Sequence, residues 1–283
     1  MRLVTAATLV LTLSAGAAYA DPTTLWAVDV SNIGSGTTSS AYAEQFGLDG
    51  ALLRQVNLGS GFSPSGIALV GSTAYISSST DGLIRSYNLS SGTLLGSFSS
   101  GMNALGALTA DATGLWANDY TGGNQALHYS FAGVRDRALT LSYCSSYCNA
   151  LEIATIGGTS YLLANRGETE PSATYDLYTT GGAVATAALI SGVPNGAGAA
   201  YDAGPQVFYV ADAYDGTVQT YSATGAALGT ITLGGTAPDT GFNADFPGQR
   251  FVADLAVQVP EPATLALLAG GLGLAGLVRR RRA

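Results

Sequence analysis

A short apolar pattern recurs five times along this chain of 283 residues. Each copy combines aromatic or aliphatic side chains with one or two polar residues at its end; the copies are Leu25–Asp29, Ala74–Ser78, Leu115–Asp119, Tyr161–Asn165 and Phe208–Asp212. Their first residues are 49, 41, 46 and 47 positions apart. A repeat of this length constrains the fold strongly, because each unit has to bury its apolar face against a neighbouring unit.

Two of the units show the internal order most clearly. Residues 66–101 and 198–233 each contain four short β-prone runs, with a glycine turn between the third and fourth runs at Gly92 and Gly225. Four short strands in about 45 residues is the period of a β-propeller blade. The sequence therefore predicts an all-β propeller over residues 21–258, with about five four-stranded blades, or six if residues 236–258 form a degenerate blade. A β-sandwich is the alternative fold, but it does not require the period.

The two ends of the repeat region complement each other. The first unit lacks the innermost strand that the other units have, and residues 250–259 supply a strand without partners of its own. Pairing this C-terminal strand with the first unit would close the ring and remove an exposed edge. With motifs such as Phe208–Asp212 and Gly66-Ile67-Ala68, the region from 24 to 258 resembles propellers of the NHL and YVTN class.

The first twenty residues have the order of a secretory signal. Arg2 precedes an apolar run of small residues, and the segment closes on Ala18-Tyr19-Ala20. Small side chains at Ala18 and Ala20 suit the pocket of signal peptidase. We expect residues 1–20 to form a signal helix that is removed during export.

The other end of the chain has three parts. The motif Val259-Pro260-Glu261-Pro262 leads into an uncharged apolar run at 263–278. A basic end at 279–283 follows, and it consists of Arg279, Arg280, Arg281 and Arg282 and one final residue. Sixteen helical residues span about 24 Å, slightly less than a bilayer core, and arginines favour the cytoplasmic side. This pattern predicts a transmembrane helix that holds the chain transiently in the inner membrane.

These three parts, in this order, resemble the PEP-CTERM sorting signal of Gram-negative bacteria. The resemblance covers about the last 25 residues, 259–283. It implies recognition by an exosortase and processing near Pro260, Glu261 and Pro262. It also implies export to the outer surface or extracellular matrix of an organism that makes exopolysaccharide.

The charge of the expected mature region, residues 21–260, restricts its partners. It carries six arginines, no lysine and eighteen acidic side chains, a net charge of −12. Nucleic acid is excluded as a partner, because binding to phosphates depends on Lys and Arg. Anionic polysaccharide is disfavoured unless divalent cations bridge the two, whereas neutral glycans and cations remain compatible with the charge.

Cys144 and Cys148 are the two cysteines of the chain. In an oxidising compartment, two cysteines this close form a local disulfide. Three residues between them do not match a redox pair, and a zinc site would need two more ligands, of which His128 could supply at most one.

Polar residues follow the second strand of most predicted blades, on loops that open at the mouth of the central channel. They are Asp29, Asp119, Asn165, Asp212 and Asp215. One interpretation is a ring of oxygen ligands for Ca²⁺ or a sugar. The other, which we favour, is that each side chain accepts hydrogen bonds from the backbone of its own turn.

No catalytic signature accompanies these residues, and no cofactor is expected apart from the Ca²⁺ considered above. No Gly-x-Ser-x-Gly elbow is followed by a plausible acid and base, and His128 alternates as a strand residue does. The leading hypothesis is a non-enzymatic surface or matrix propeller that binds glycans or proteins, or is purely structural. The alternative is a metal-dependent lactonase or hydrolase that uses the Asp and Asn residues at the channel mouth.

Overall fold

The computed structural model describes residues 23–29, 40–121, 123–144, 148–167, 172–237 and 250–259. The predicted signal segment 1–20, the predicted helix 263–278 and the arginines 279–282 lie outside these residues. Within the described ranges, no helix is long and apolar enough to cross a membrane.

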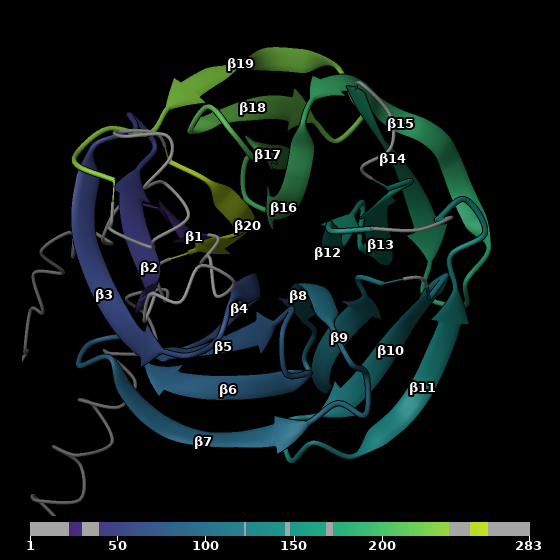
Figure 1. The fold of residues 1–283 in the computed structure, drawn as a ribbon. Coiled ribbons are helices and arrows are strands. Elements are labelled where there is room, and N and C mark those ends of the chain that lie inside the picture. The colour runs from purple at the N-terminus through teal and green to yellow at the C-terminus, as the bar shows by residue number, and fades with distance from the viewer. Residues whose placement is uncertain are drawn as a thin grey trace, which may run out of the picture. The chain divides into compact units, whose positions relative to one another are not determined.

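Five four-stranded antiparallel sheets surround a central axis as the blades of a propeller (Figure 1). From the axis outward, blade 1 holds β20 (Val252–Gln258), β1 (Thr24–Asp29), β2 (Ser40–Gly47) and β3 (Leu52–Ser60). Blade 2 holds β4 (Pro64–Val70), β5 (Thr73–Ser78), β6 (Leu83–Asn88) and β7 (Thr93–Ser99). Blade 3 holds β8 (Leu105–Ala110), β9 (Gly114–Asp119), β10 (Gln125–Ser130) and β11 (Arg135–Thr140). Blade 4 holds β12 (Leu151–Ile156), β13 (Thr159–Asn165), β14 (Ser172–Thr179) and β15 (Val184–Pro194). Blade 5 holds β16 (Gly196–Asp202), β17 (Val207–Asp212), β18 (Thr217–Ser222) and β19 (Ala227–Thr232).

The C-terminal strand closes the ring, as the sequence predicts. β20 pairs antiparallel with β1 from Thr24↔Gln258 to Asp29↔Val252. The Gln258 side chain reinforces the end of this pairing, because its Oε1 accepts hydrogen bonds from Trp26 Nε1 at 2.9 Å and from Gln45 Nε2 at 3.2 Å. The described residues after β19 therefore complete blade 1, and the count is five blades rather than six.

The core is divided among the seams between blades. Five buried apolar clusters are present, and each joins two neighbouring blades. Trp26, for example, packs between blades 1 and 2, and Trp116 packs between blades 3 and 4. Inner strands such as β16 are buried along their whole length, whereas the outer strand β19 is almost entirely exposed. The repeated apolar pattern thus stabilises the ring only when each blade has two neighbours.

Tyrosine hydroxyls from the third strands connect adjacent blades. Tyr87 in β6 donates to the Leu58 carbonyl of blade 1 at 3.0 Å, and Tyr129 in β10 donates to the Ser100 carbonyl of blade 2 at 2.8 Å. Both tyrosine rings are buried. The two tyrosines occupy equivalent positions of the repeat, and each ties its blade to the preceding one. A buried hydroxyl needs a hydrogen-bond partner, and here the neighbouring blade supplies it.

A buried carboxyl group at the axis connects three inner strands. Oδ2 of Asp254, on β20, accepts hydrogen bonds from the backbone N–H groups of Ile67 at 3.0 Å and Leu108 at 3.2 Å. The strands can approach because Gly66 has no side chain; a Cβ there would lie 2.5 Å from Leu108 N. Asp254 is fully buried, and this burial raises its pKa, although the backbone hydrogen bonds lower it.

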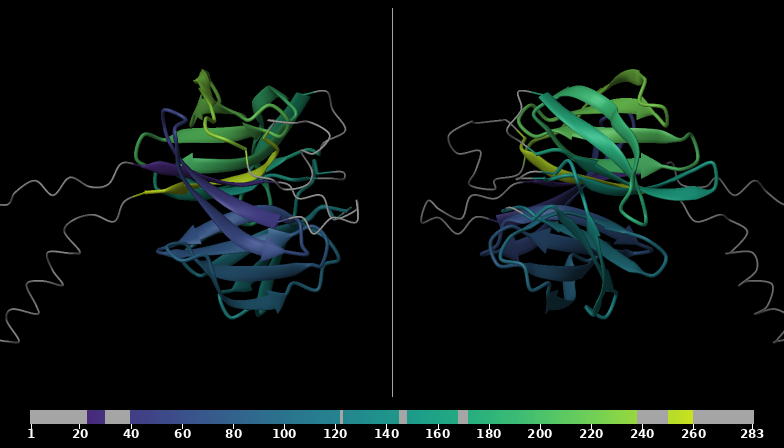
Figure 2. Two further views of the ribbon diagram at one scale, coloured as in Figure 1. Left: turned by 60° about the vertical axis from the view of Figure 1, so that its left-hand side comes forward. Right: turned by 90° about the vertical axis from the view of Figure 1, so that its right-hand side faces the viewer.

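The ring has two distinct faces, which we call the mouth face and the terminal face. The mouth face carries the connections that precede the inner strands and those that join second to third strands. The terminal face carries the beginning of β1 and the end of β20, which lie side by side at the same side of the ring in Figure 2. The chain therefore enters and leaves the propeller on one face.

The hydrogen bonds of Asp254 predict different outcomes for two substitutions. Asp254→Asn keeps an oxygen that can accept both backbone bonds, so the free energy of unfolding should stay within about 1 kcal/mol of the wild type. Asp254→Ala leaves two buried N–H groups unpaired beside a cavity and should cost about 2–4 kcal/mol. Urea unfolding at pH 7 measures both. An equal loss in the two variants would show that the negative charge, rather than the hydrogen bonds, is what the axis requires.

Candidate functional site

A cavity of about 210 Å³ opens at the mouth face around the axis. All five blades meet there through the residues that precede or begin their inner strands, and loops after the second strands complete the wall. Its polar and aromatic side chains come from Ser63, Ser65, Ser79, Tyr120, Asn149, Tyr214 and Phe251. A ring fold therefore brings together residues that are up to 188 positions apart in the chain.

Two aromatic side chains form one side of this cavity. The rings of Tyr214 and Phe251 pack edge to face, with their centroids 5.9 Å apart. Tyr214 follows β17 and is 51% exposed, whereas Phe251 immediately precedes β20 and is buried. A second cavity of about 100 Å³ adjoins the first and shares Asn149 and Tyr214 with it.

Three of the predicted ligand residues instead stabilise their own turns. Asp119 Oδ1 accepts from the backbone and hydroxyl of Thr121, and Asp215 Oδ1 accepts from those of Thr217. Asp212 Oδ1 accepts from Tyr214 N at 3.0 Å. None of the three carboxylates lines either mouth cavity. This geometry is the one that the turn interpretation describes.

Asn165 joins two segments at the mouth face. Its Oδ1 accepts from the backbone N–H groups of Asn149 at 3.0 Å and Ala150 at 3.2 Å, and its Nδ2 donates to Asn149 Oδ1. Asn149 lines both cavities. Asn165 therefore acts on the cavity wall indirectly, by fixing the backbone that carries Asn149.

Asp29 lies in a buried charged cluster at the seam between blades 1 and 5. Its neighbour Glu44 is paired with Arg250, whose Nε donates to Glu44 Oε2 at 2.7 Å and whose Nη1 donates to the Leu233 carbonyl at 3.0 Å. Within the part of the chain that the structure describes, neither oxygen of Asp29 accepts a hydrogen bond from a donor. Burial, followed by repulsion from Glu44, raises the pKa of Asp29 well above its usual value. This carboxyl group therefore belongs to the seam and does not line the cavity.

The five predicted ligand residues do not gather into one site. Over the described part of the chain, no group of three or more His, Cys, Asp or Glu side chains is placed to hold a metal ion. The positions follow the repeat, so they are distributed over blades 1, 3, 4 and 5. The structure thus supplies no observation that favours Ca²⁺ at these positions.

The predicted local disulfide is present. Cys144 and Cys148 are bonded, with their Cα atoms 6.0 Å apart. Both are buried in the seam between blades 3 and 4. The Cys148 carbonyl also accepts a hydrogen bond from Asn118 Nδ2 at 2.6 Å, so the bridge holds the segment that enters blade 4 against blade 3.

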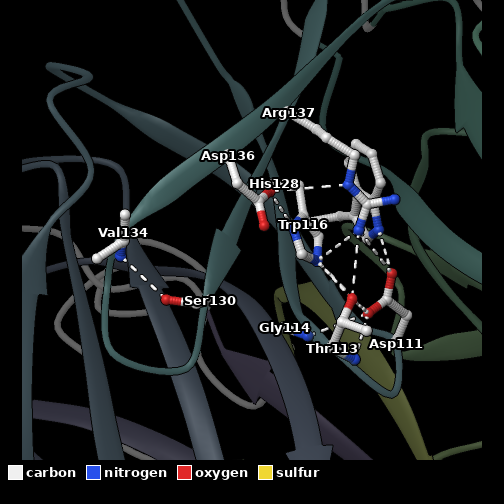
Figure 3. Close-up of polar contacts among 9 residues, drawn as sticks. All are labelled: Asp111, Thr113, Gly114, Trp116, His128, Ser130, Val134, Asp136 and Arg137. Carbon is white, nitrogen blue, oxygen red and sulfur yellow. Dashed lines mark hydrogen bonds and ion pairs between the residues drawn. The ribbon is translucent and has the colours of Figure 1, made fainter.

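His128 lies in a dense polar cluster on the terminal face of blade 3 (Figure 3). Its Nδ1 is 2.6 Å from Asp136 Oδ1, and its Nε2 is 3.3 Å from Thr113 Oγ1. This order of groups resembles a hydroxyl, a base and an orienting acid. However, Thr113 Oγ1 donates to Asp111 Oδ1 at 2.6 Å, so its proton is already held by a carboxylate.

Further contacts make this cluster a structural staple. Trp116 Nε1 donates to Asp111 Oδ2 at 2.9 Å, and the imidazole of the fully buried His128 packs 4.8 Å from the Trp116 ring. The guanidinium group of Arg137 lies over the Trp116 ring, with its Cζ atom 5.0 Å from the ring centroid. Burial opposes ionisation of Asp111, but hydrogen bonds from Thr113 and Trp116 outweigh it and lower the pKa of Asp111. The cluster binds β9, β10 and β11 together.

Glu152 is a second acid of the inner strands. Its Oε1 accepts from Tyr201 N of blade 5 at 3.0 Å, and its Oε2 accepts from Thr109 Oγ1 of blade 3 at 2.6 Å. Burial raises the pKa of Glu152 to about 8, against the effect of these hydrogen bonds. The side chain thus links three blades, and it resists ionisation near neutral pH.

Sequence reasoning missed the residues that form the cavity. Tyr120 and Tyr214 come one and two positions after residues that were singled out, Asp119 and Asp212. A tyrosine within two residues of the repeated acidic position is a signal that could have identified both. Phe251 and Asn149 carry no comparable signal, because they precede their inner strands in segments without a repeated motif.

Comparison with known families identifies the C-terminal signal. Residues 258–282 match the PEP-CTERM protein-sorting motif. The chain therefore carries a motif that implies export, processing by an exosortase and anchoring at the cell surface. No curated protein matches the sequence.

Solved structures agree with the architecture of the domain. One similar chain belongs to the crystal structure of a nidogen/laminin complex, with a TM-score of 0.55 and 11% identity, covering 85% of this chain and 100% of that one. Another belongs to the hydrazine synthase of Kuenenia stuttgartiensis, with a TM-score of 0.44 and 11% identity, covering 65% of this chain and 53% of that one. At 11% identity, the likeness to the nidogen/laminin chain is one of fold alone.

The raised pKa of Glu152 predicts a pH-dependent stability. In the folded protein the Glu152 carboxyl group keeps its proton up to about pH 8, whereas in the unfolded chain it loses this proton above about pH 4.5. The contribution of Glu152 to the free energy of unfolding therefore falls as the pH rises from about 4.5 to about 8. Glu152→Gln removes this loss. The difference in unfolding free energy between pH 5 and pH 8 should shrink by on the order of 2 kcal/mol relative to the wild type.

Urea unfolding at the two pH values tests this prediction. The exposed Asp49 provides the control, and Asp49→Asn should leave the pH dependence of the wild type in place. If Glu152→Gln retains the full wild-type dependence, the fall belongs to other acids, such as Asp29 and Asp254.

Proposed function

We propose that this protein is an exported propeller that acts, after exosortase sorting, as a non-enzymatic binding or structural module. It would work at the outer surface or in the extracellular matrix, in association with exopolysaccharide or with surface proteins. Signal peptidase would remove residues 1–20, and the inner membrane would hold the chain only during transit. The sorting motif supports export and exosortase processing, and the propeller fold supports a binding or structural role.

One observation carries the proposal. The matched motif begins at Gln258, the last residue of the ring-closing strand, on the terminal face. The cavity opens on the mouth face. Any attachment made just after Val259 would therefore hold the propeller by the terminal face and leave the mouth face directed away from the attachment.

The charges and side chains of the domain fit a binding role better than catalysis. Six arginines against eighteen acids disfavour polyanionic partners. Where the structure describes the side chains, Asp119, Asp212 and Asp215 stabilise turns, Asp29 lies in a seam between blades, and His128 is enclosed in the staple of blade 3. No observation in these regions favours the hydrolase alternative.

Intact mass of the protein from its native host tests the route. With the exosortase present, the mass should correspond to a chain that begins near residue 21 and is processed near residues 260–262. Without the enzyme, Arg279–Arg282 should be retained. A mass that includes these arginines in both strains would replace the sorting proposal with a plain membrane anchor.

Cysteine labelling of intact cells tests the orientation. Thr80 lies in an exposed connection of the mouth face, and Ser72 lies in an exposed connection of the terminal face of the same blade. A membrane-impermeant maleimide should label Thr80→Cys faster than Ser72→Cys on cells, but equally on purified protein. Faster labelling of Ser72→Cys on cells would reverse the proposed display.

A further inference from the structure

We propose that the cavity at the mouth face binds one uncharged sugar unit at the end of a neutral saccharide. This inference rests on the proposed function, because it names a ligand for the displayed face. It is carried by the size of the cavity, by the mixture of side chains in its wall and by the lack of charged side chains among the described residues of that wall.

The size of the cavity limits the ligand. The main cavity has about 210 Å³ and the adjoining one about 100 Å³, and both are bounded by Asn149 and Tyr214. Together they lie near the lower end of the range for small-molecule sites. This space suits one sugar ring with a second unit near the entrance, and it is too small for a folded partner or a long peptide.

The wall supplies the two kinds of contact that a sugar ring needs. A sugar has an apolar face of C–H groups and a rim of hydroxyl groups, so its site combines aromatic surfaces with neutral hydrogen-bonding groups. Tyr120, Tyr214 and Phe251 provide aromatic surface. The hydroxyls of Ser63, Ser65 and Ser79 and the amide of Asn149 provide neutral hydrogen-bonding groups on the same wall.

Tyr214 is the side chain best placed to contact a ring at the entrance. It borders both cavities, and 51% of its surface is exposed. The edge-to-face contact with Phe251 restricts the orientation of its ring before any ligand arrives. A restrained aromatic ring loses little conformational freedom on binding.

The charge distribution selects against charged sugars. Among the residues that the structure describes, none that lines the two cavities is Asp, Glu, Arg, Lys or His. A uronate or sulfate group would be desolvated there without a cation to pair with, and it would approach a domain with a net charge of −12.

Calorimetric titration of the processed protein with defined probes tests the inference. The neutral probes are maltotriose, cellotriose and tri-N-acetylchitotriose, and the charged probe is trigalacturonate. At least one neutral probe should bind, whereas trigalacturonate should not. Tyr214→Ala should weaken that binding about tenfold, and Tyr214→Phe should retain most of it.

A matched aromatic control separates the site from the rest of the surface. Tyr143 is similarly exposed, at 45%, but borders neither cavity, so Tyr143→Ala should leave the affinity unchanged. Melting temperatures of all variants show whether they fold. The inference is overturned if no neutral probe binds at 10 mM, a generous excess over the affinity range of weak sites, or if a well-folded Tyr214→Ala variant binds as the wild type does.

Failure of the inference is distinguishable from failure of the proposed function. Processing and labelling are measured on the same strains, and neither depends on the saccharide. Normal sorting with no saccharide binding would contradict only the ligand. Saccharide binding by a protein that is never processed near residues 260–262 would contradict the proposed route and leave the site intact.

Discussion

The antiparallel pairing of β20 with β1 is the contact on which the propeller depends. Each of the five apolar clusters lies between two blades, so no blade can bury both faces unless the ring is complete. The pairing joins residues more than 220 positions apart, as the bond between Trp26 and Gln258 shows. Closing a loop of that length costs about 5 kcal/mol of chain entropy. The completed seams on both sides of blade 1 have to offset this cost.

Buried polar groups fix the register of the inner strands relative to the neighbouring blades. The hydroxyls of Tyr87 and Tyr129 reach backward to the preceding blade, while Asp254 and Glu152 each accept bonds from two other blades near the axis. A slip of one residue along an inner strand would break these bonds and leave buried groups unpaired. The same carboxyl groups make the axis sensitive to pH, since burial opposes their ionisation.

The parts of this structure that repeat could be predicted from sequence, and the parts that do not repeat could not. The period of the apolar runs predicted the blades, and the missing inner strand of the first unit predicted the closure by residues 250–259. Short spacing in an oxidising compartment predicted the bond between Cys144 and Cys148. By contrast, the cavity residues Asn149 and Phe251 and the axial Asp254 acquire their roles from neighbours in other blades. Such neighbours are set by the ring geometry, which a linear pattern does not contain.

Thr24 and Gln258 are paired neighbours, so the architecture of the ring does not depend on which connection contains the chain break. A short peptide could join these two ends, and new ends could be opened in the connection between β7 and β8, residues 100–104. Such a circular permutant would keep every blade and every seam. Its sorting tail, however, would leave from the mouth face, so the terminal face would be directed away from the attachment. In this fold, the position of the chain break decides which face the cell presents to its surroundings.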